Sequence, residues 1–270
     1  MPELPEVETT RRGLEPLVVG RSIERVEVRE PRLRWPVEKA LGSRLAGRLV
    51  TAVGRRGKYL LLTTDDGTLL VHLGMSGRLR YHSTPPPPDK HDHVDLLFAG
   101  GAVLRFRDPR RFGSLHFSAA PERHALLRDL GPEPLGPGFT GEYLERACRG
   151  RRVAIKPHLM NSRVVAGVGN IYANEALYRA GIHPARQAGR IARPRLEGLV
   201  ERVRDVLAEA IERGGTTLRD FADGDGNPGY FQLALRAYGR AGEPCAECGA
   251  TIRLAVLGQR ATYYCPRCQR

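Results

Sequence analysis

The sequence predicts a two-domain α+β fold in which an antiparallel β-sandwich or barrel precedes a helical region that ends in a zinc ribbon. Three observations support this prediction. Between about residue 23 and residue 118, apolar residues alternate with polar ones in short runs, which is typical of half-buried strands. From about residue 142, apolar residues recur at helical spacing. Two close pairs of cysteines stand at the C-terminal end.

Length and composition narrow the class of protein. The 270 residues exceed one typical domain, and 41% hydrophobic residues are compatible with a globular core. The formal net charge of +13 favours a polyanionic partner, which is nucleic acid before it is an anionic membrane surface. No run of about 18 apolar residues occurs, and the start lacks the pattern of a secretion signal. We therefore expect a cytoplasmic, nucleoid-associated protein without a membrane partner.

The N-terminal half is expected to contain one helix and then strands. Over residues 6–17, Val7, Leu14 and Leu17 form a thin apolar stripe that predicts a helix. Turn signals such as Asp65-Asp66-Gly67 separate short apolar runs, which indicates strands joined by tight turns. Four consecutive prolines within 84–88 predict an exposed loop. The expected strands are 23–28, 49–53, 58–64, 68–73, 93–98, 103–107 and 114–117.

Residues 131–134, Gly-Pro-Glu-Pro, predict a hinge, and the pattern after it is helical. Helices are expected over 142–149, 155–161, 171–180 and 195–213. The last is the strongest, because Gly214-Gly215 ends it and its apolar residues share one face, namely Leu196, Leu199, Val203, Val206, Leu207, Ala210 and Ile211. Residues 216–229, rich in Gly and Asp, predict a long polar loop.

Four of the five cysteines form a C-x2-C-x16-C-x2-C pattern, and Cys148 stands apart from them. Two close thiolate pairs separated by a short hairpin suit tetrahedral zinc, whereas a reducing cytosol disfavours disulfides. A site with four thiolates leaves no coordination position for substrate, so we expect one structural zinc ion. Its predicted ligands are Cys245, Cys248, Cys265 and Cys268.

The first residues suggest a nucleophile. Trimming of the initiator methionine would leave Pro2 with a free secondary amine beside the carboxylate of Glu3. An α-amino group titrates near pH ~8 and a lysine near ~10.4, so much more of the former is neutral at physiological pH. A neutral secondary amine attacks carbon and can form an iminium ion that serves as an electron sink. A second-position proline also occurs in frayed starts and at the first position of a helix, so the residues alone leave both interpretations open.

Two further regions could bind an anion. In the sequence around Gly167, Gly169 and Asn170, glycines open an expected helix, whose N-terminal N–H groups could hold a phosphate. Asn170 could equally be a simple helix cap. In the β domain, Asp108-Pro-Arg-Arg-Phe-Gly113 places two guanidinium groups beside an aromatic ring, which suits a phosphate contact and a wedge into a base stack. Phe112 could instead belong to the core and the arginines could be solvated.

The same domain carries Lys58 at a strand start, His72 and Met75 around a Gly74 turn, and two histidines in Lys90-His91-Asp92-His93. The two histidines have no third ligand nearby in the sequence, so we do not expect a metal there. They could also lie at a strand edge.

Together these stretches resemble the bacterial formamidopyrimidine-DNA glycosylase family, also known as 8-oxoguanine DNA glycosylases. The resemblance runs in order along the whole chain and includes the terminal zinc ribbon. It is carried by Met1-Pro-Glu-Leu-Pro-Glu-Val-Glu-Thr9, Arg55-Arg-Gly-Lys58-Tyr-Leu, His72-Leu-Gly-Met75-Ser-Gly, Asp108-Pro-Arg-Arg-Phe-Gly113, Gly131-Pro-Glu-Pro-Leu135 and Gly167-Val-Gly-Asn170-Ile-Tyr-Ala173.

The resemblance implies a base-excision repair enzyme with glycosylase and AP-lyase activities. Its domains would be a catalytic β-sandwich over 1–131, a helix-two-turn-helix domain over 132–235 and a zinc finger over 236–270. The implied partner is double-stranded DNA containing 8-oxoguanine, formamidopyrimidines or abasic sites, bound by a monomer without a nucleotide cofactor. The damaged nucleotide would be flipped out of the helix, because the chemistry cannot reach C1′ inside the stack.

The resemblance also implies residue roles. Pro2 would displace the base and form a Schiff base with deoxyribose, and Glu3 would assist as acid and base. Lys58 would act in β-elimination and Arg260 in δ-elimination. The implied DNA contacts are His91, Arg110, Arg151 and Asn170, with Lys156 a further basic candidate, and the residues that fill the void left by the flipped nucleotide are Met75, Arg110 and Phe112.

The chain departs from the family pattern at two positions and leaves two other functions to weigh. Arg219 and Arg151 stand where the family carries lysine, which keeps the charge but changes the hydrogen-bond geometry. The related endonuclease VIII type shares the proline mechanism and prefers oxidised pyrimidines, but Leu4 and the void-filling set favour the purine branch. A non-catalytic zinc-ribbon DNA-binding protein would also account for the charge and the cysteines.

Overall fold

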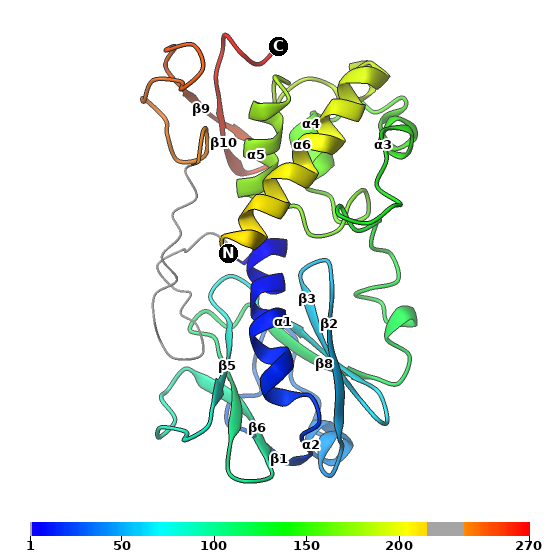
Figure 1. Ribbon diagram of the computed structural model, residues 1–270, viewed down its shortest axis with the longest axis vertical. Coiled ribbons are helices and arrows are strands. Elements are labelled where there is room, and N and C mark those ends of the chain that lie inside the picture. Colours follow the sequence, from blue (N-terminus) through cyan, green and yellow to red (C-terminus); the bar gives the residue numbers. More distant parts are fainter. Residues whose placement is uncertain (1, 215–234) are drawn as a thin grey trace. The chain divides into compact units, whose positions relative to one another are not determined.

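The protein is described by a computed structural model, which defines residues 2–214 and 235–270 (Figure 1). Contacts between Cα atoms divide the described chain into two compact units, residues 2–128 and residues 129–213 with 235–270. The expected loop at 216–229, including Arg219, lies outside the described residues, as does Met1. Within the described ranges, no helix is both long enough and apolar enough to cross a membrane.

The first unit is built from two antiparallel four-stranded sheets. One sheet has the strand order β1-β6-β7-β5 and the other β2-β3-β4-β8. Successive side chains of a strand point to opposite faces of the sheet. Along β3, the side chains of Leu60, Leu62 and Thr64 are therefore buried, and their neighbours are partly exposed. The strands are β1 (Ile23–Val28), β2 (Val50–Arg56), β3 (Tyr59–Thr64), β4 (Thr68–His72), β5 (Arg78–His82), β6 (Asp92–Phe98), β7 (Val103–Arg107) and β8 (Ser114–Ser118).

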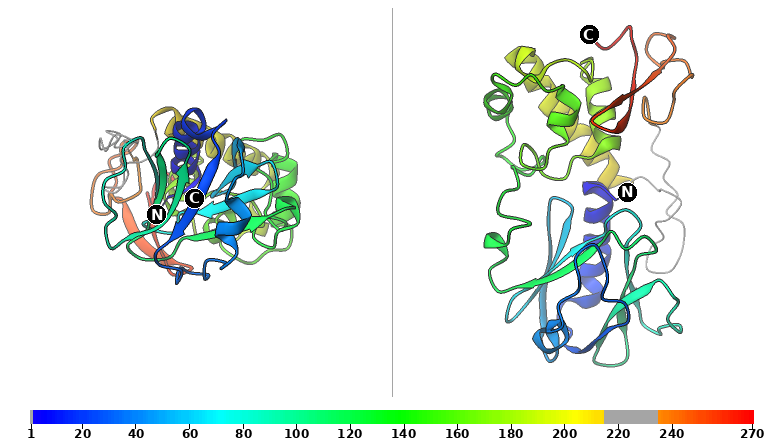
Figure 2. Two further views of the ribbon diagram at one scale, coloured as in Figure 1. Left: turned by 90° about the horizontal axis from the view of Figure 1, so that it is seen from below. Right: turned by 180° about the vertical axis from the view of Figure 1, so that it is seen from behind.

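Helix α1 (Leu4–Val18) joins both sheets in one core. Its buried residues Val7, Leu14 and Val18 lie on one side and pack into the cluster that includes the inner faces of both sheets. The view from behind in Figure 2 shows α1 running along the sheets. A proline in the first turn suits a helix start, because an N–H at this position would have no partner within the helix. The short helix α2 (Leu41–Leu45) contacts β1 and β8.

The expected β fold is confirmed, with differences in detail. Strand β5 and helix α2 were not predicted, and α1 begins at Leu4 rather than at residue 6. Lys58 lies in the turn between β2 and β3, where Gly57 has φ +56°, and not in the strand. The proline-rich loop at 84–88 is exposed, as predicted.

The second unit contains α3 (Gly141–Cys148), α4 (Ile155–Leu159), α5 (Asn170–Arg179) and α6 (Arg193–Glu212). All four helices were predicted, and every residue of the expected apolar stripe on α6 is buried. The short 3-10 turn Ala188–Arg190 lies in a connection of this unit, and another, Pro121–Arg123, follows β8 in the first unit. The unit ends in the hairpin β9 (Arg253–Leu257) and β10 (Arg260–Tyr264), as expected for a zinc ribbon.

Candidate nucleic-acid interface and metal site

The start of α1 fixes Pro2 and Glu3 immediately before a helix. Glu3 is the N-cap residue, its side chain is 1% exposed, and its amide donates a hydrogen bond of 2.7 Å to Oε2 of Glu6. Pro2 is partly exposed. A carboxylate at a helix N-terminus is stabilised by the helix dipole. Helix α1 starts at Leu4, so the alternative that Pro2 occupies the first helical position is wrong. The buried, hydrogen-bonded Glu3 beside Pro2 also argues against a frayed start.

Lys58 is carried by a turn that is tied to α1. Arg55, at the end of β2, donates to Oε2 of Glu8 at 3.1 Å and to the Gly57 carbonyl at 3.0 Å. Partial burial opposes the ionisation of Glu8, but hydrogen bonds from Arg12 and Arg55 and the charge of Arg11 hold its pKa below the ordinary value. Glu8 therefore stays charged and joins the Lys58 turn to the helix that begins beside Pro2.

The loops around Met75 and Arg110 are in direct contact. A side chain at Gly74 would meet the backbone of Phe112 at 2.4 Å, and one at Gly113 would meet the His72 carbonyl at 2.7 Å. Only glycines allow this approach. Met75 is thereby placed beside the Asp108–Gly113 turn, on which the Arg110 guanidinium lies 4.9 Å from the centre of the Phe112 ring.

Phe112 is 41% exposed, so it does not belong to the core. Arg110 is exposed as well, and Arg111 lies 3.4 Å from Glu30, an ion pair that leaves it on the surface. The structure thus brings the three void-filling candidates onto two adjoining loops that face solvent.

His72 connects these loops to Lys58. Its Nδ1 accepts a hydrogen bond of 3.0 Å from the Gly74 amide. Burial, together with the positive charges of Lys58 and Arg34, lowers the pKa of His72 to about 4. His72 is therefore neutral at pH 7, and it marks Lys58 as a close neighbour of the Met75 loop.

His91 borders a cavity of about 240 Å³ beside the Asp108–Gly113 turn. His93 differs from it: it lies in β6, is 3% exposed, and its Nε2 is 2.7 Å from the Asp108 carbonyl oxygen. Two cationic side chains among the lining residues could attract an anionic oxygen. The cavity is lined by Glu30, Lys90, His91, His93, Pro109 and Arg111.

In the second unit, Asn170 and Arg260 lie on elements that touch. Gly169 is the N-cap of α5, and Asn170 is the first helical residue, so the alternative in which Asn170 simply caps the helix is wrong. Its Nδ2 instead donates a hydrogen bond of 3.1 Å to the carbonyl of Ala261, next to Arg260. Arg260 begins β10 and is exposed.

Arg151 and Lys156 have different surroundings. Arg151 is exposed in the loop after α3, and its charge adds to burial in lowering the pKa of His158 on α4. Lys156, also on α4, is 0% exposed. Its Nζ donates to the Ala261 carbonyl at 2.8 Å and to Oγ1 of Thr262 at 2.7 Å. Nothing in the sequence around Lys156 distinguishes it from a surface lysine.

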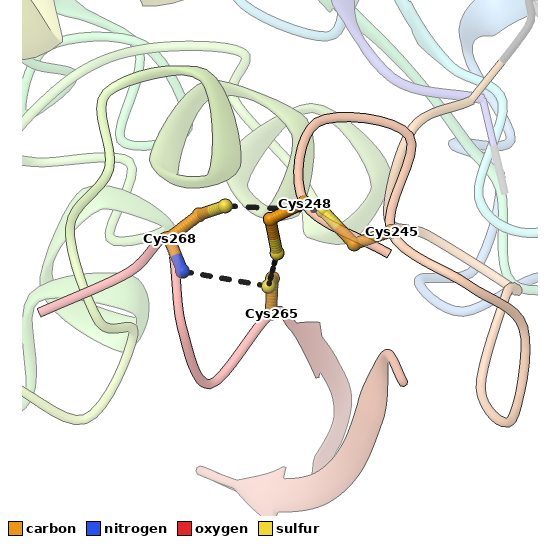
Figure 3. A group of neighbouring side chains, drawn as sticks. All are labelled: Cys245, Cys248, Cys265 and Cys268. Carbon is orange, nitrogen blue, oxygen red and sulfur yellow. Dashed lines mark hydrogen bonds between the residues drawn. The ribbon is translucent and has the colours of Figure 1, made fainter. Parts of the chain in front are cut away.

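The four expected zinc ligands converge from two loops (Figure 3). Their sulfur atoms all lie within 4.8 Å of one another, with Cys245 and Cys268 at 3.9 Å and Cys248 and Cys265 at 3.5 Å. Tetrahedral zinc with Zn–S bonds of about 2.3 Å needs sulfurs about 3.8 Å apart, so the donor set fits.

The surroundings of Cys245 favour its thiolate form. Burial opposes ionisation, but hydrogen bonds from the Tyr178 hydroxyl and from the amides of Glu247 and Cys248 lower the pKa of Cys245 to about 6. Burial raises the pKa of Cys148, the fifth cysteine, to about 11, and Cys148 packs in the core of the second unit. It therefore remains a neutral thiol.

Comparison with known proteins accounts for most of the chain. Residues 1–115 match the formamidopyrimidine-DNA glycosylase N-terminal domain, residues 130–222 the H2TH domain of the same enzymes, and residues 242–270 a zinc finger found in FPG and IleRS. The zinc-finger match and the converging sulfurs identify one structural zinc site.

Relatives match over the full length. The formamidopyrimidine-DNA glycosylases of Methylococcus capsulatus and Pseudomonas aeruginosa are 62% and 57% identical, each with 100% of both chains covered. Among solved structures, a Lactococcus lactis FPG variant with Fapy-dG-containing DNA has a TM-score of 0.91 at 35% identity, with 100% of both chains covered. The MutM protein of Thermus thermophilus has a TM-score of 0.89 at 40% identity, covering 99% of this chain and 98% of that one.

Proposed function

Because this chain belongs to the formamidopyrimidine-DNA glycosylase family, we propose that it removes oxidised purines from duplex DNA and then cleaves the abasic strand. The family supports the DNA glycosylase activity, and the pairing of Pro2 with the buried Glu3 carries the rest of the proposal. The substrates would be 8-oxoguanine, formamidopyrimidines and abasic sites. A Lactococcus lactis relative has been solved with DNA containing an abasic site, which supports the last of these.

The first step is displacement of the base. After removal of Met1, the Pro2 nitrogen is a secondary amine of pKa ~8, and its lone pair attacks C1′ of the damaged nucleotide. The C1′–N bond breaks, and the base leaves with the bonding electrons and a proton. When the sugar ring opens, the nitrogen lone pair forms the iminium ion. The base takes its proton from solvent, and Glu3, held beside Pro2 by the start of α1, is positioned to take the proton that the alkylated Pro2 nitrogen loses and to pass it to the ring oxygen.

Two eliminations follow from the iminium ion. It withdraws electrons, so loss of the C2′ proton breaks the C3′–O bond, and loss of the C4′ proton then breaks the C5′–O bond. Water finally hydrolyses the imine and restores the Pro2 amine. We assign Lys58 to the first elimination and Arg260 to the second, where their cationic groups would also hold the departing phosphates.

Binding requires an extruded nucleotide and a filled gap. The Arg110 guanidinium and the Phe112 ring are exposed and stacked on each other, beside Met75, so they form an apolar wedge with one charge. Such a wedge can enter a base stack and compensate the unstacking energy. We assign phosphate contacts to His91, Arg151 and Asn170, and the net charge of +13 supports them.

The remaining parts have supporting roles. The zinc ion, bound by its four cysteines, supplies no chemistry to the reaction and keeps the hairpin that carries Arg260 folded. We also propose that the protein acts as a monomer, and that residues 1–131, 132–235 and 236–270 serve as catalytic, helix-two-turn-helix and zinc-finger domains.

Reductive trapping tests the proposal. Protein whose N-terminus is shown by mass spectrometry to be Pro2 is mixed with an 8-oxoguanine duplex and sodium borohydride, which reduces an iminium ion to a stable amine. We expect a crosslinked species whose DNA is attached to residue 2. A duplex containing an oxidised pyrimidine serves as a comparison, and preferential trapping on it would assign the chain to the pyrimidine-specific branch. Tight binding without any adduct on either duplex would instead identify a DNA-binding protein without lyase activity.

A further inference from the structure

Lys156 is a buried cation whose partners lie on the strand that begins with Arg260. Its side chain is 0% exposed, and its Nζ donates to Oγ1 of Thr262 at 2.7 Å and to the Ala261 carbonyl at 2.8 Å. Placing an ammonium group away from water costs several kcal/mol unless hydrogen bonds compensate it. A buried lysine whose ammonium group donates to protein atoms is poorly placed to contact a phosphate.

The hydrogen bonds continue from Thr262 to Arg260. Oγ1 of Thr262 donates to the carbonyl of Arg260 at 3.0 Å. The directions are fixed, because an ammonium group has only donors and a carbonyl only accepts. The Thr262 hydroxyl must therefore accept from Lys156 and give its single proton to Arg260. Charge-assisted donation to a hydroxyl also strengthens the bond that this hydroxyl donates in turn.

The rest of this strand edge is held in the same way. Among the residues that the structure describes, strand β10 pairs with β9 alone. On the other side, Asn170 donates to the Ala261 carbonyl at 3.1 Å, and Oδ1 of Asn174 accepts from the Tyr263 amide at 2.8 Å. A Cβ added at Gly258, in the hairpin turn, would lie 3.4 Å from the side chain of Pro157, so the turn also rests close to α4. A two-stranded hairpin is marginal by itself, so these contacts determine where Arg260 is held.

The amino-acid usage of the chain agrees with a specific need for an ammonium group. Only four of its 43 Lys and Arg residues are lysines, at positions 39, 58, 90 and 156. A compact ammonium can serve two acceptors inside a closed site, whereas the planar guanidinium of arginine needs more room and a different arrangement of acceptors.

We infer that Lys156 is a positioning residue that acts through Thr262 on Arg260, and that its ammonium group stays within the protein when DNA is bound. This inference rests on the proposed function only in that Arg260 acts at the lesion. It replaces the role of DNA contact that the sequence suggests for Lys156.

The test uses the full-length zinc-loaded protein and substitutions that separate position from charge. Thr262→Val removes the hydroxyl without changing charge or size, and Thr262→Ser restores it. Lys156→Met removes the cation, and Lys39→Met, at an exposed position in the other unit, removes the same charge. Zinc content and thermal unfolding show whether each variant is folded. If Lys156→Met does not fold, the test uses Thr262→Val alone.

The first measurement is hydrogen exchange at the amides of residues 260–263. We expect about tenfold faster exchange in Thr262→Val and Lys156→Met, and wild-type exchange in Thr262→Ser and Lys39→Met. Unchanged exchange in both of the first two variants would overturn the inference. This measurement does not depend on catalysis, so it holds even if Arg260 proves to have no role in strand cleavage.

The second measurement is the single-turnover conversion of an abasic duplex, with β- and δ-elimination products resolved. We expect the δ-elimination rate to fall about tenfold or more in Thr262→Val and Lys156→Met, as displacement of a reacting group predicts. In an Arg260→Ala background neither change should have a further effect. If Lys156→Met instead lowers the slope of log K against log salt by about 0.9 while Thr262→Val matches wild type, Lys156 contacts a phosphate and the inference is wrong.

Discussion

The Ser76 hydroxyl donates a hydrogen bond of 2.6 Å to Oδ1 of the fully buried Asp108. Oδ2 of the same carboxylate accepts one of 2.7 Å from the Gly113 amide, and the Arg110 amide donates to Oγ of Ser76 at 3.1 Å. One carboxylate and one hydroxyl thus join the loop that follows Met75 to the turn that carries Arg110 and Phe112. These hydrogen bonds hold the wedge in place, and none of them involves the side chain of a wedge residue.

Replacement of this hydroxyl should loosen the wedge without removing any of it. We expect Ser76→Ala to lower the free energy of unfolding by about 1 kcal/mol and the rate of base excision about tenfold, because the proposed void-filling residues lose their relative position. The salt dependence of DNA binding should stay as in wild type, since no cation is lost. Ser43→Ala, an exposed serine on α2, is the matched control. Equal excision rates for the two variants would show that the link does not matter.

Most of the fold could be predicted because its signals are local. The alternation of apolar and polar residues predicted seven of the strands, and every residue of the predicted apolar stripe on α6 is buried. Strand β5 was missed because its alternation, Arg-Leu-Arg-Tyr-His, has few apolar residues and follows a glycine turn. Helix α2 has five residues, too few for a period to appear.

The candidate site was predictable only as far as chemistry is local. The zinc ligands follow from spacing, and the Asp108–Gly113 turn was recognised as polar. The role of Thr262 and the burial of Lys156 depend on contacts across more than 100 positions, as in the bond from Lys156 to Thr262. No periodicity or motif in the sequence encodes such a contact.

The proposed nucleophilic amine of Pro2 leads to a prediction about the N-terminus. A protein that carries one additional residue before Pro2 should form no borohydride adduct, because an amide nitrogen is neither basic nor nucleophilic. Proteolytic removal of that residue should restore trapping in the same preparation, which makes the chain its own control. Pro2→Gly should lose most strand cleavage. Cleavage at the wild-type rate by the extended protein would rule out Pro2 as the nucleophile.

His72 predicts a pH dependence of stability. Its pKa is about 4 in the folded protein and about 6.5 in the unfolded chain, so the unfolded chain binds the proton more tightly. Stability is therefore complete above pH ~6.5 and falls as the pH drops toward ~4, by up to about 3 kcal/mol from this residue. His72→Asn keeps an acceptor for the Gly74 amide and removes the titration. We expect the difference in the free energy of unfolding between wild type and His72→Asn to shrink with falling pH. The contribution of the zinc site, which both proteins share, cancels in this difference. A constant difference would contradict the assignment.

Loss of one zinc ligand should remove both the metal and DNA binding. We expect Cys265→Ser to contain no zinc by metal analysis and to bind duplex DNA at least 100-fold more weakly, because the metal supplies the folding free energy of the ribbon. Cys148→Ala removes the one cysteine outside the cluster and should keep one zinc ion per chain. Tight DNA binding by metal-free Cys265→Ser would show that the hairpin folds without zinc.

Glu175 holds residues 236–238, at the start of the zinc ribbon, through three backbone amides. Its carboxylate accepts from Arg236 at 2.9 Å, from Ala237 at 2.9 Å and from Tyr238 at 2.8 Å, and the side chain is 2% exposed. Hydrogen bonds to a buried carboxylate are stronger than those between neutral groups. Glu175→Gln retains one acceptor oxygen and turns the other into a donor that faces an amide donor. We expect a loss of about 2–4 kcal/mol in the free energy of unfolding and faster zinc transfer to a chelator. Glu201→Gln, an exposed carboxylate on α6, should change neither quantity, and if Glu175→Gln behaves like it, the three amides are not what holds this segment in place.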